Sequence, residues 1–228
     1  MLDFLFPRRC PVCKNRLIGK SCICTTCMGN LPRTFYHTQT GNRLEQRFYG
    51  TVPIERATAY FFYSPESPYH TILHQLKYYK DKKMGIYMGR CMATHLKHSR
   101  YNFFEGIDLI IPVPLSSFRM RQRGYNQSEL LAEGIKSETG LPIETGVVIR
   151  TTDNPTQTHL NDIERWENVK GIFKATPEAS QKLNNKHILL IDDVTTTGAT
   201  LTSCALAIKE TAPECRISIA TLCMTTDI

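Results

Sequence analysis

Residues 188–201 have the sequence ILLIDDVTTTGATL, and this stretch decides the fold that we expect. It begins with four apolar residues, 188–191, a short continuous run typical of a parallel strand that is buried on both faces. Two carboxylates, Asp192 and Asp193, follow at the end of the run. A loop of small and hydroxyl-bearing residues then leads into a segment that predicts a helix. The polar residues therefore lie at the carboxyl end of a strand, where open α/β sheets bind ligands.

The segments around this unit continue the alternation of strand and helix. We expect the last strand of the chain to close the sheet, with strands at residues 57–63, 107–113, 146–151, 187–191 and 217–224. Helical spacing of apolar residues and helix-start signals predict helices at residues 68–79, 84–98, 126–140 and 200–211. A polar segment, 153–171, turns helical toward its end. The pattern predicts an α/β fold with a doubly wound parallel sheet and right-handed crossovers.

The loop after the carboxylates is suited to hold a phosphate group. A glycine and small neighbours let backbone N–H groups approach an anion closely, and the amino end of the following helix adds about half a positive charge. Threonine hydroxyls supply further donors. Because the loop contains no lysine, it is not a Walker A loop. We therefore expect a phosphate to be bound by Thr195, Thr196, Thr197, Gly198, Ala199 and Thr200.

The two adjacent acids need partners of their own, because they would repel each other and a nearby phosphate. Vicinal hydroxyl groups donate to carboxylates, and a divalent cation offsets their charge. A phosphate in the loop together with hydroxyls on Asp192 and Asp193 indicates ribose 5-phosphate as the ligand. The competing interpretation is an ordinary strand–helix turn with N-capping threonines and a pair of surface acids.

Five of the nine cysteines crowd near the amino terminus. Cys10 with Cys13, and Cys24 with Cys27, form two C-x2-C pairs, and two such pairs complete a closed tetrahedron around one Zn²⁺. A closed site has no open position for water, which indicates a structural role for the zinc. Cys22 could replace Cys24 as a ligand, and redox chemistry is the functional alternative.

The length of 228 residues accommodates one α/β domain and a small appendage. We assign residues 1–34 to the four-cysteine zinc module, 35–56 to a linker and 57–228 to the α/β domain. No run of 18 apolar residues and no signal peptide is recognisable, so we expect a cytoplasmic protein without membrane insertion. The net charge of +7 favours an anionic partner.

Residues 188–201 closely resemble the phosphoribosyl pyrophosphate (PRPP) motif of type I phosphoribosyltransferases, which joins an apolar strand, two acids and a threonine-rich loop with glycine. The resemblance implies that Asp192 and Asp193 contact the ribose hydroxyls and that the loop amides bind the 5′-phosphate. It also implies Mg²⁺ bound together with PRPP. The turn after the strand at residues 107–113 would bind the pyrophosphate, at Pro114, Leu115 and Ser116.

Three further features resemble one branch of these proteins, the competence-associated ComF family. They are the cysteine module, the tripeptide LKY at residues 76–78 and the heptapeptide RQRGYNQ at residues 121–127. Downstream, a spaced Q…R…NV…F pattern begins at Gln157. We expect anion or nucleic-acid contacts at Lys77, Arg121, Arg123 and Arg165. The alternative for these cations is an ordinary solvated surface.

Two functions follow from the resemblance. In the first, the chain is a magnesium-dependent phosphoribosyltransferase, in which a nucleophile attacks the anomeric carbon of PRPP as pyrophosphate leaves. In the second, it is a binding module of DNA uptake during natural transformation, which senses PRPP or a nucleotide and contacts single-stranded DNA. The resemblance also implies a helicase of the uptake machinery as a partner. A zinc-dependent scaffold with a degenerate site is a third alternative, and the intact acids and threonine loop count against it.

Overall fold

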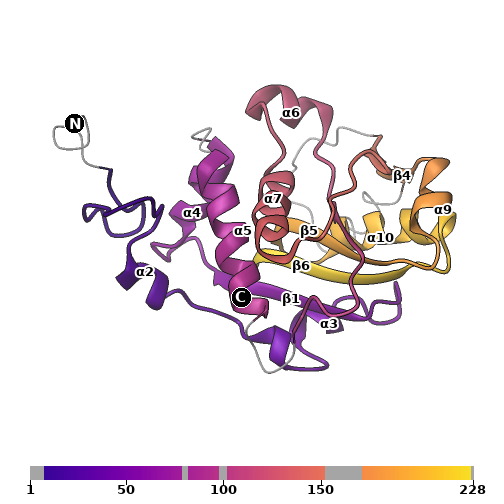
Figure 1. The fold of residues 1–228 in the computed structure, drawn as a ribbon, viewed down its shortest axis with the longest axis horizontal. Helices are drawn as coiled ribbons and strands as arrows, with labels where there is room; N and C mark the ends of the chain where they lie inside the picture. The colour runs from indigo at the N-terminus through magenta and orange to yellow at the C-terminus, as the bar shows by residue number, and fades with distance from the viewer. Residues whose placement is uncertain (1–7, 79–81, 98–101, 152–170, 227–228) are drawn as a thin grey trace.

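The computed structural model describes residues 8–78, 82–97, 102–151 and 171–226 (Figure 1). Its centre is a sheet of four parallel strands in the order β1-β6-β5-β2. In this order the strands are β1 (Arg56–Tyr63), β6 (Arg216–Thr225), β5 (His187–Thr195) and β2 (Leu109–Pro112). Because the strands are parallel, their carboxyl ends meet at one edge of the sheet, which confirms the predicted fold class.

Strand β5 shows why this sequence forms a central strand. Its side chains alternate between two cores, with Ile188 and Leu190 on one face of the sheet and Leu189 and Ile191 on the other. All four are fully buried. A continuous apolar run is therefore required here, since both faces of the strand are covered by other elements.

Helices cover both faces of the sheet (Figure 1). One core contains apolar residues of α4 (His70–Tyr78), α5 (Lys82–Lys97) and α7 (Gln127–Thr139). The other contains residues of α3 (Arg43–Gln46), α9 (Glu178–Leu183) and α10 (Ala199–Thr211). The other helical segments among the described residues are α2 (Thr25–Gly29), η1 (Tyr36–Thr38) and α6 (Ser117–Arg123). Within the described part of the chain, no helix combines the length and the apolar character needed to cross a membrane.

Two expectations about the strands are wrong. The last strand, β6, does not close the sheet but lies inside it, and β1 takes the outer position. The segment predicted at 146–151 contains β3 (Val148–Arg150), which pairs antiparallel with β4 (Phe173–Ala175) in a separate two-stranded sheet. In β3 Val148 is buried and Ile149 is 46% exposed, an alternation typical of strands with one covered face. The helical pattern expected within 153–171 falls almost entirely outside the described residues.

The segment expected to be a linker, 35–56, also contributes to the core beside the sheet. Four of its side chains are buried there, and they are Tyr36, Leu44, Phe48 and Val52. The carboxylate of Glu45 accepts a hydrogen bond from the backbone N–H of Ala57 at 3.2 Å. The amide of Asn42 donates to the carbonyl of Ala57 at 3.0 Å. These bonds fix the segment against the beginning of β1.

Helices α5 and α7 approach each other unusually closely through glycines. A Cβ atom added to Gly89 would lie 2.2 Å from the carbonyl oxygen of Leu131, and one added to Gly134 would lie 2.3 Å from that of Ile86. These neighbours are backbone atoms, which cannot turn away as side chains do. The two helices can therefore pack at this distance only with glycine at both positions.

We predict that Gly89→Ala or Gly134→Ala lowers the free energy of unfolding by about 2 kcal/mol, because the overpacking outweighs the better helix propensity of alanine. Urea unfolding followed by circular dichroism measures the change. Gly29→Ala in α2 is the matched control, since an added Cβ there meets no described atom within 4 Å. Equal stability of the wild type and both core variants would contradict the close packing.

Candidate functional site

A polar cavity of about 460 Å³ opens at the carboxyl ends of β2 and β5. It is lined by residues from six helices and strands and from the loops that follow β2 and β5. The charged residues of its lining are Asp192, Asp193, Lys77, Arg119, Arg123 and Arg150. Four cations thus face two carboxylates, so the cavity favours an anionic ligand over a cationic one.

Asp192 is the first of the two acids at the end of β5. One of its carboxylate oxygens, Oδ1, accepts hydrogen bonds from the hydroxyl of Ser128 at 2.9 Å and from the backbone N–H of Asp193 at 2.8 Å. Burial and the neighbouring charge of Asp193 raise the pKa of Asp192 to about 7. The two hydrogen bonds and Lys77 oppose this rise. At neutral pH the carboxyl group is therefore poised between its two protonation states.

Asp193 is buried and is paired with Lys77 of α4. The ammonium nitrogen of Lys77 lies 3.3 Å from Oδ2 of Asp193. Burial lowers the pKa of Lys77, but the charge of Asp193 and the hydrogen bond to it outweigh burial and leave the pKa above its ordinary value. Lys77 is thus a charged member of the cavity and not a solvated surface lysine.

The loop expected to bind phosphate turns at Gly198, which has a φ of 88° and precedes α10. This left-handed conformation favours glycine because it carries no Cβ. Thr196 and Thr200 line the cavity. Thr195 is buried, and the hydroxyl of Thr197 accepts a 3.4 Å hydrogen bond from the backbone N–H of Ala199. The loop therefore places threonine hydroxyls beside the amino end of α10, a helix of 13 residues.

The segment expected to be a linker, 35–56, packs against this loop at Gly198. A Cβ atom added to Gly198 would lie 3.5 Å from Cβ of Arg47 and 3.6 Å from the ring of Phe48. This contact was not predictable, because residues 35–56 show no clear periodicity. A short helix, α3, brings these two residues into place.

The turn after β2 contributes two of its three expected residues to the cavity. Pro114 and Leu115 line it. Ser116 instead begins α6, where its hydroxyl accepts a hydrogen bond from the backbone N–H of Arg119 at 3.3 Å. Its role in the structure is therefore that of a helix cap.

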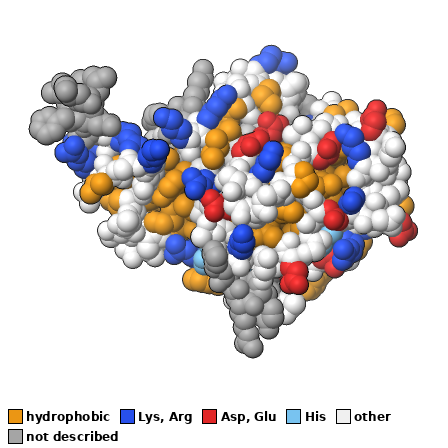
Figure 2. Space-filling view, viewed as in Figure 1, with side chains coloured by type: hydrophobic (Ala, Val, Ile, Leu, Met, Phe, Trp, Pro, Cys, Tyr) orange, Lys and Arg blue, Asp and Glu red, His pale blue; other side chains and the backbone are white. Residues whose placement is uncertain are grey.

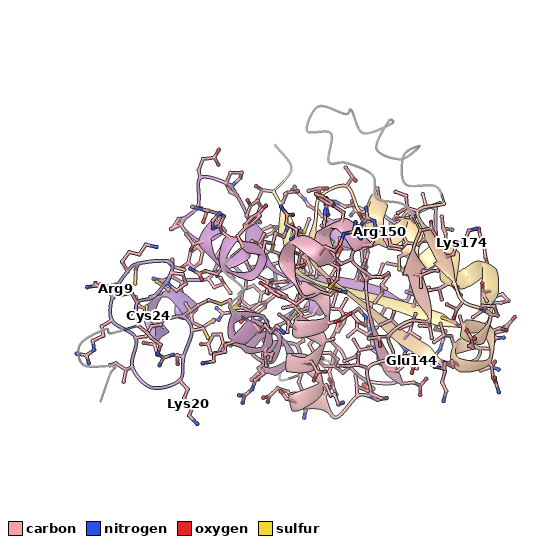
Figure 3. The ribbon with its side chains drawn as sticks, turned by 90° about the horizontal axis from the view of Figure 1, so that it is seen from above. Arg9, Lys20, Cys24, Glu144, Arg150 and Lys174 are labelled. Carbon is pink, nitrogen blue, oxygen red and sulfur yellow. The ribbon has the colours of Figure 1, made fainter. Side chains whose placement is uncertain are left out.

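Helix α6 determines which of the clustered arginines reach the cavity. Arg119 and Arg123 line it, whereas Arg121 is exposed and does not. The helices expected from the sequence do not include α6, and the helical spacing of its three arginines separates them. Arg150, at the end of β3, also lines the cavity. It was not identified from the sequence, because its position at a strand end was its only signal. Figure 3 shows where it lies. Arg165 lies outside the described residues.

The heptapeptide at 121–127 connects the elements around the cavity. The hydroxyl of Tyr125 donates to the carbonyl of Leu76 in α4 at 2.6 Å. The amide of Asn126 donates to the carbonyl of Val113 at 3.0 Å and its oxygen caps α7. Arg123 lies over the ring of Tyr78, 5.8 Å from its centroid. These contacts connect α4, α6, α7 and the turn after β2 to one another.

Four cysteines of the amino-terminal module form the metal site. The sulfur atoms of Cys10, Cys13, Cys24 and Cys27 all lie within 4.8 Å of one another. Sulfurs bound tetrahedrally to one Zn²⁺ are about 3.8 Å apart, so the four thiols fit a closed, structural zinc site. Cys22 lies outside this group and lines a separate groove, which decides in favour of Cys24. Figure 3 shows Cys24 with Arg9 and Lys20 at one end of the molecule.

Comparisons with known proteins agree with this arrangement. Residues 82–227 match the family described as Phosphoribosyl transferase domain, and residues 1–39 match the Double zinc ribbon domain. "DNA utilization protein YhgH" of Escherichia coli (strain K12) is 28% identical over 197 residues, which are 86% of this chain and 82% of the relative.

Two shorter matches carry competence names. "Competence protein F" of Haemophilus influenzae is 33% identical over 107 residues, 47% of this chain and 46% of the relative. "Competence protein ComFC" of Bacillus subtilis is 34% identical over 114 residues, 50% of this chain and 43% of the relative. With the matched domain spanning more than half of its residues, the chain belongs to the phosphoribosyl transferase domain family, in its ComF branch.

Proposed function

We propose that the cavity binds PRPP together with Mg²⁺ and that the chain transfers the phosphoribosyl group. The observation that carries this proposal is the meeting of three features in one cavity. They are the adjacent carboxylates of β5, the threonine loop at the amino end of α10, and four cations from α4, α6 and β3. A sugar phosphate with a second anionic group matches all three in charge and in hydrogen-bonding character.

Each part of the cavity has a role in this proposal. Asp192 and Asp193 accept hydrogen bonds from the ribose hydroxyls. The loop from Thr195 to Thr200 binds the 5′-phosphate with its backbone N–H groups and hydroxyls. The cations Arg119 and Arg123, beside the turn after β2, face the pyrophosphate. This division places the anomeric carbon between the acids and the arginines.

The carboxylates also fit Mg²⁺, which prefers oxygen ligands and is usually held by one or two carboxylates and the phosphates of a substrate. Asp192 and Asp193 are the acids that line the cavity, so they would hold the ion there. Bound Mg²⁺ would neutralise charge on the departing pyrophosphate. The residues of the chain orient the sugar and stabilise the negative charge that develops on the leaving group.

A role in handling DNA during uptake is the second part of the proposal. It rests on the competence and DNA utilization names of the relatives and on charge. Five exposed cations crowd the zinc module, and they are Arg8, Arg9, Lys14, Arg16 and Lys20. The sequence contains no Asp or Glu between residues 8 and 44. Figure 2 shows Lys and Arg side chains gathered over this end of the molecule.

A groove next to the module is lined by two of these cations. It has a volume of about 360 Å³, and its lining includes Arg8, Arg9, Gln75 and Lys83 but no acid. The lining residues of the groove thus come from the zinc module, α4 and α5. The backbone of single-stranded DNA matches such a basic groove, which can follow successive phosphates.

We predict that PRPP with Mg²⁺ raises the melting temperature by mass action and that Asp192→Asn or Asp193→Asn abolishes the rise. Differential scanning fluorimetry measures it, and Glu133→Gln, an exposed acid on α7, is the matched control. The wild type should then release pyrophosphate from PRPP when a suitable acceptor is supplied. A melting temperature that is unmoved by millimolar PRPP would refute the proposed ligand.

The raised pKa of Asp192 predicts opposite pH trends for binding and stability. Because ribose hydroxyls and Mg²⁺ prefer the carboxylate, the affinity for PRPP should rise as the pH increases from 6 to 8, by at most about tenfold per pH unit. The folded state binds the proton more tightly than the unfolded state does, so this group's contribution to stability is lost as the pH rises from about 4 through about 7. Calorimetry on the wild type measures the trend in affinity, and urea unfolding at several pH values measures the trend in stability. Asp192→Asn should flatten the stability trend, and equal stability trends in wild type and variant would exclude Asp192 as its source.

Binding of single-stranded DNA should weaken steeply with salt, because the groove neutralises phosphates. The triple substitution Arg8→Ala, Arg9→Ala and Lys83→Ala should reduce the slope of log affinity against log salt by about 2. Fluorescence anisotropy of a labelled oligonucleotide measures the slope. Lys136→Ala, Lys174→Ala and Lys186→Ala remove the same charge from exposed positions elsewhere, and this control should bind like the wild type. An unchanged slope in the groove variant would place the DNA elsewhere.

A further inference from the structure

Gln127 is a polar side chain that is buried in the wall of the cavity with half of its amide unused. It is the first residue of α7, it is 1% exposed, and it lines the cavity. Its oxygen Oε1 accepts a hydrogen bond from Nη1 of Arg123 at 3.0 Å. Its nitrogen Nε2 is buried and has no hydrogen-bond partner among the described residues.

The contact with Arg123 fixes the orientation of this amide. A guanidinium group only donates hydrogen bonds, so the amide oxygen must be the atom that faces it. Rotation of the amide by 180° would bring two donors together. The NH₂ group is therefore the side of the amide that faces away from Arg123.

A buried donor without an acceptor is unfavourable, and such a group in a native structure marks a place where a partner belongs. The surroundings indicate the chemistry of that partner. Arg119 and Arg123 line the same cavity as Gln127, so their positive charge favours an acceptor that carries negative charge. The neighbouring residue, Asn126, donates to the carbonyl of Val113, so Gln127 lies next to the turn after β2.

We propose that Nε2 of Gln127 donates a hydrogen bond to a pyrophosphate oxygen of the ligand and that Arg123 holds the amide in the orientation required. This inference rests on the proposed function and assigns Gln127 to one half of that ligand, the leaving group. Gln127 then determines whether the cavity accepts a diphosphate beside the sugar. The ribose 5-phosphate half lies with β5 and α10 and does not involve it.

The substitution Gln127→Glu separates this role from a purely structural one. The introduced carboxylate still accepts from Arg123 and gains an ion pair, while the donor is replaced by a negative charge. The melting temperature of the free protein should be retained or raised. The affinity for inorganic pyrophosphate with Mg²⁺ should fall by at least about 100-fold, because a hydrogen bond to a charged group is lost and repulsion is added.

Two further variants test the cause. Gln127→Met keeps the length of the side chain and adds no charge, but it removes both the donor and the oxygen that accepts from Arg123, so the affinity for pyrophosphate should fall by about tenfold. Gln122→Glu adds the same charge at an exposed position of α6 that does not line the cavity, and it should bind pyrophosphate like the wild type. Isothermal titration calorimetry with the full chain measures all three variants.

Ribose 5-phosphate is the second probe, and it separates the inference from the proposed function. All variants should bind it within about threefold of the wild type. Unchanged pyrophosphate binding in Gln127→Glu, or an equal loss for both probes, would overturn the role of Gln127 and leave the proposed function standing. A wild type that binds neither probe nor PRPP would overturn both.

Discussion

Two adjacent carboxylates at the end of β5, one partly buried and one buried, are the constraint on which the rest of the structure depends. Two such charges repel each other and lose hydration, so they persist only where other elements supply compensation. Lys77 comes from α4 and Ser128 from α7, and each contacts one acid. The arrangement of these two helices on one face of the sheet is thus tied to the chemistry of the cavity.

Much of the fold could be predicted from the sequence, because the stretch 188–201 combines an apolar strand with polar residues where an open sheet binds ligands. Periodicity located α5, α7 and α10 closely. It could not reveal the order of strands, since β1 and β6 are similarly apolar and pairing is decided by distant contacts. Likewise β3 reads as one more strand, although it pairs only with β4.

The candidate site was predictable where residues are adjacent in sequence and obscure where folding assembles them. Asp192, Asp193 and the threonine loop form one segment, so their chemistry could be interpreted directly. Arg150 carries no such signal. Arg121 and Arg123 are equivalent in the sequence, but the helical geometry of α6 brings only Arg123 to the cavity. The resemblance to ComF proteins marked the heptapeptide at 121–127, but only the structure relates its side chains to four different elements.

The zinc module shares its core with α4, and this has a thermodynamic consequence. Cys10 and Cys27 pack in the same apolar cluster as Leu76, and the hydroxyl of Tyr69, just before α4, donates to the carbonyl of Cys27 at 3.0 Å. Since α4 also positions Lys77, zinc in the module and an anion in the cavity would act on one shared helix. Linkage is reciprocal. If zinc raises the affinity for the ligand by some factor, the bound ligand raises the affinity for zinc by the same factor.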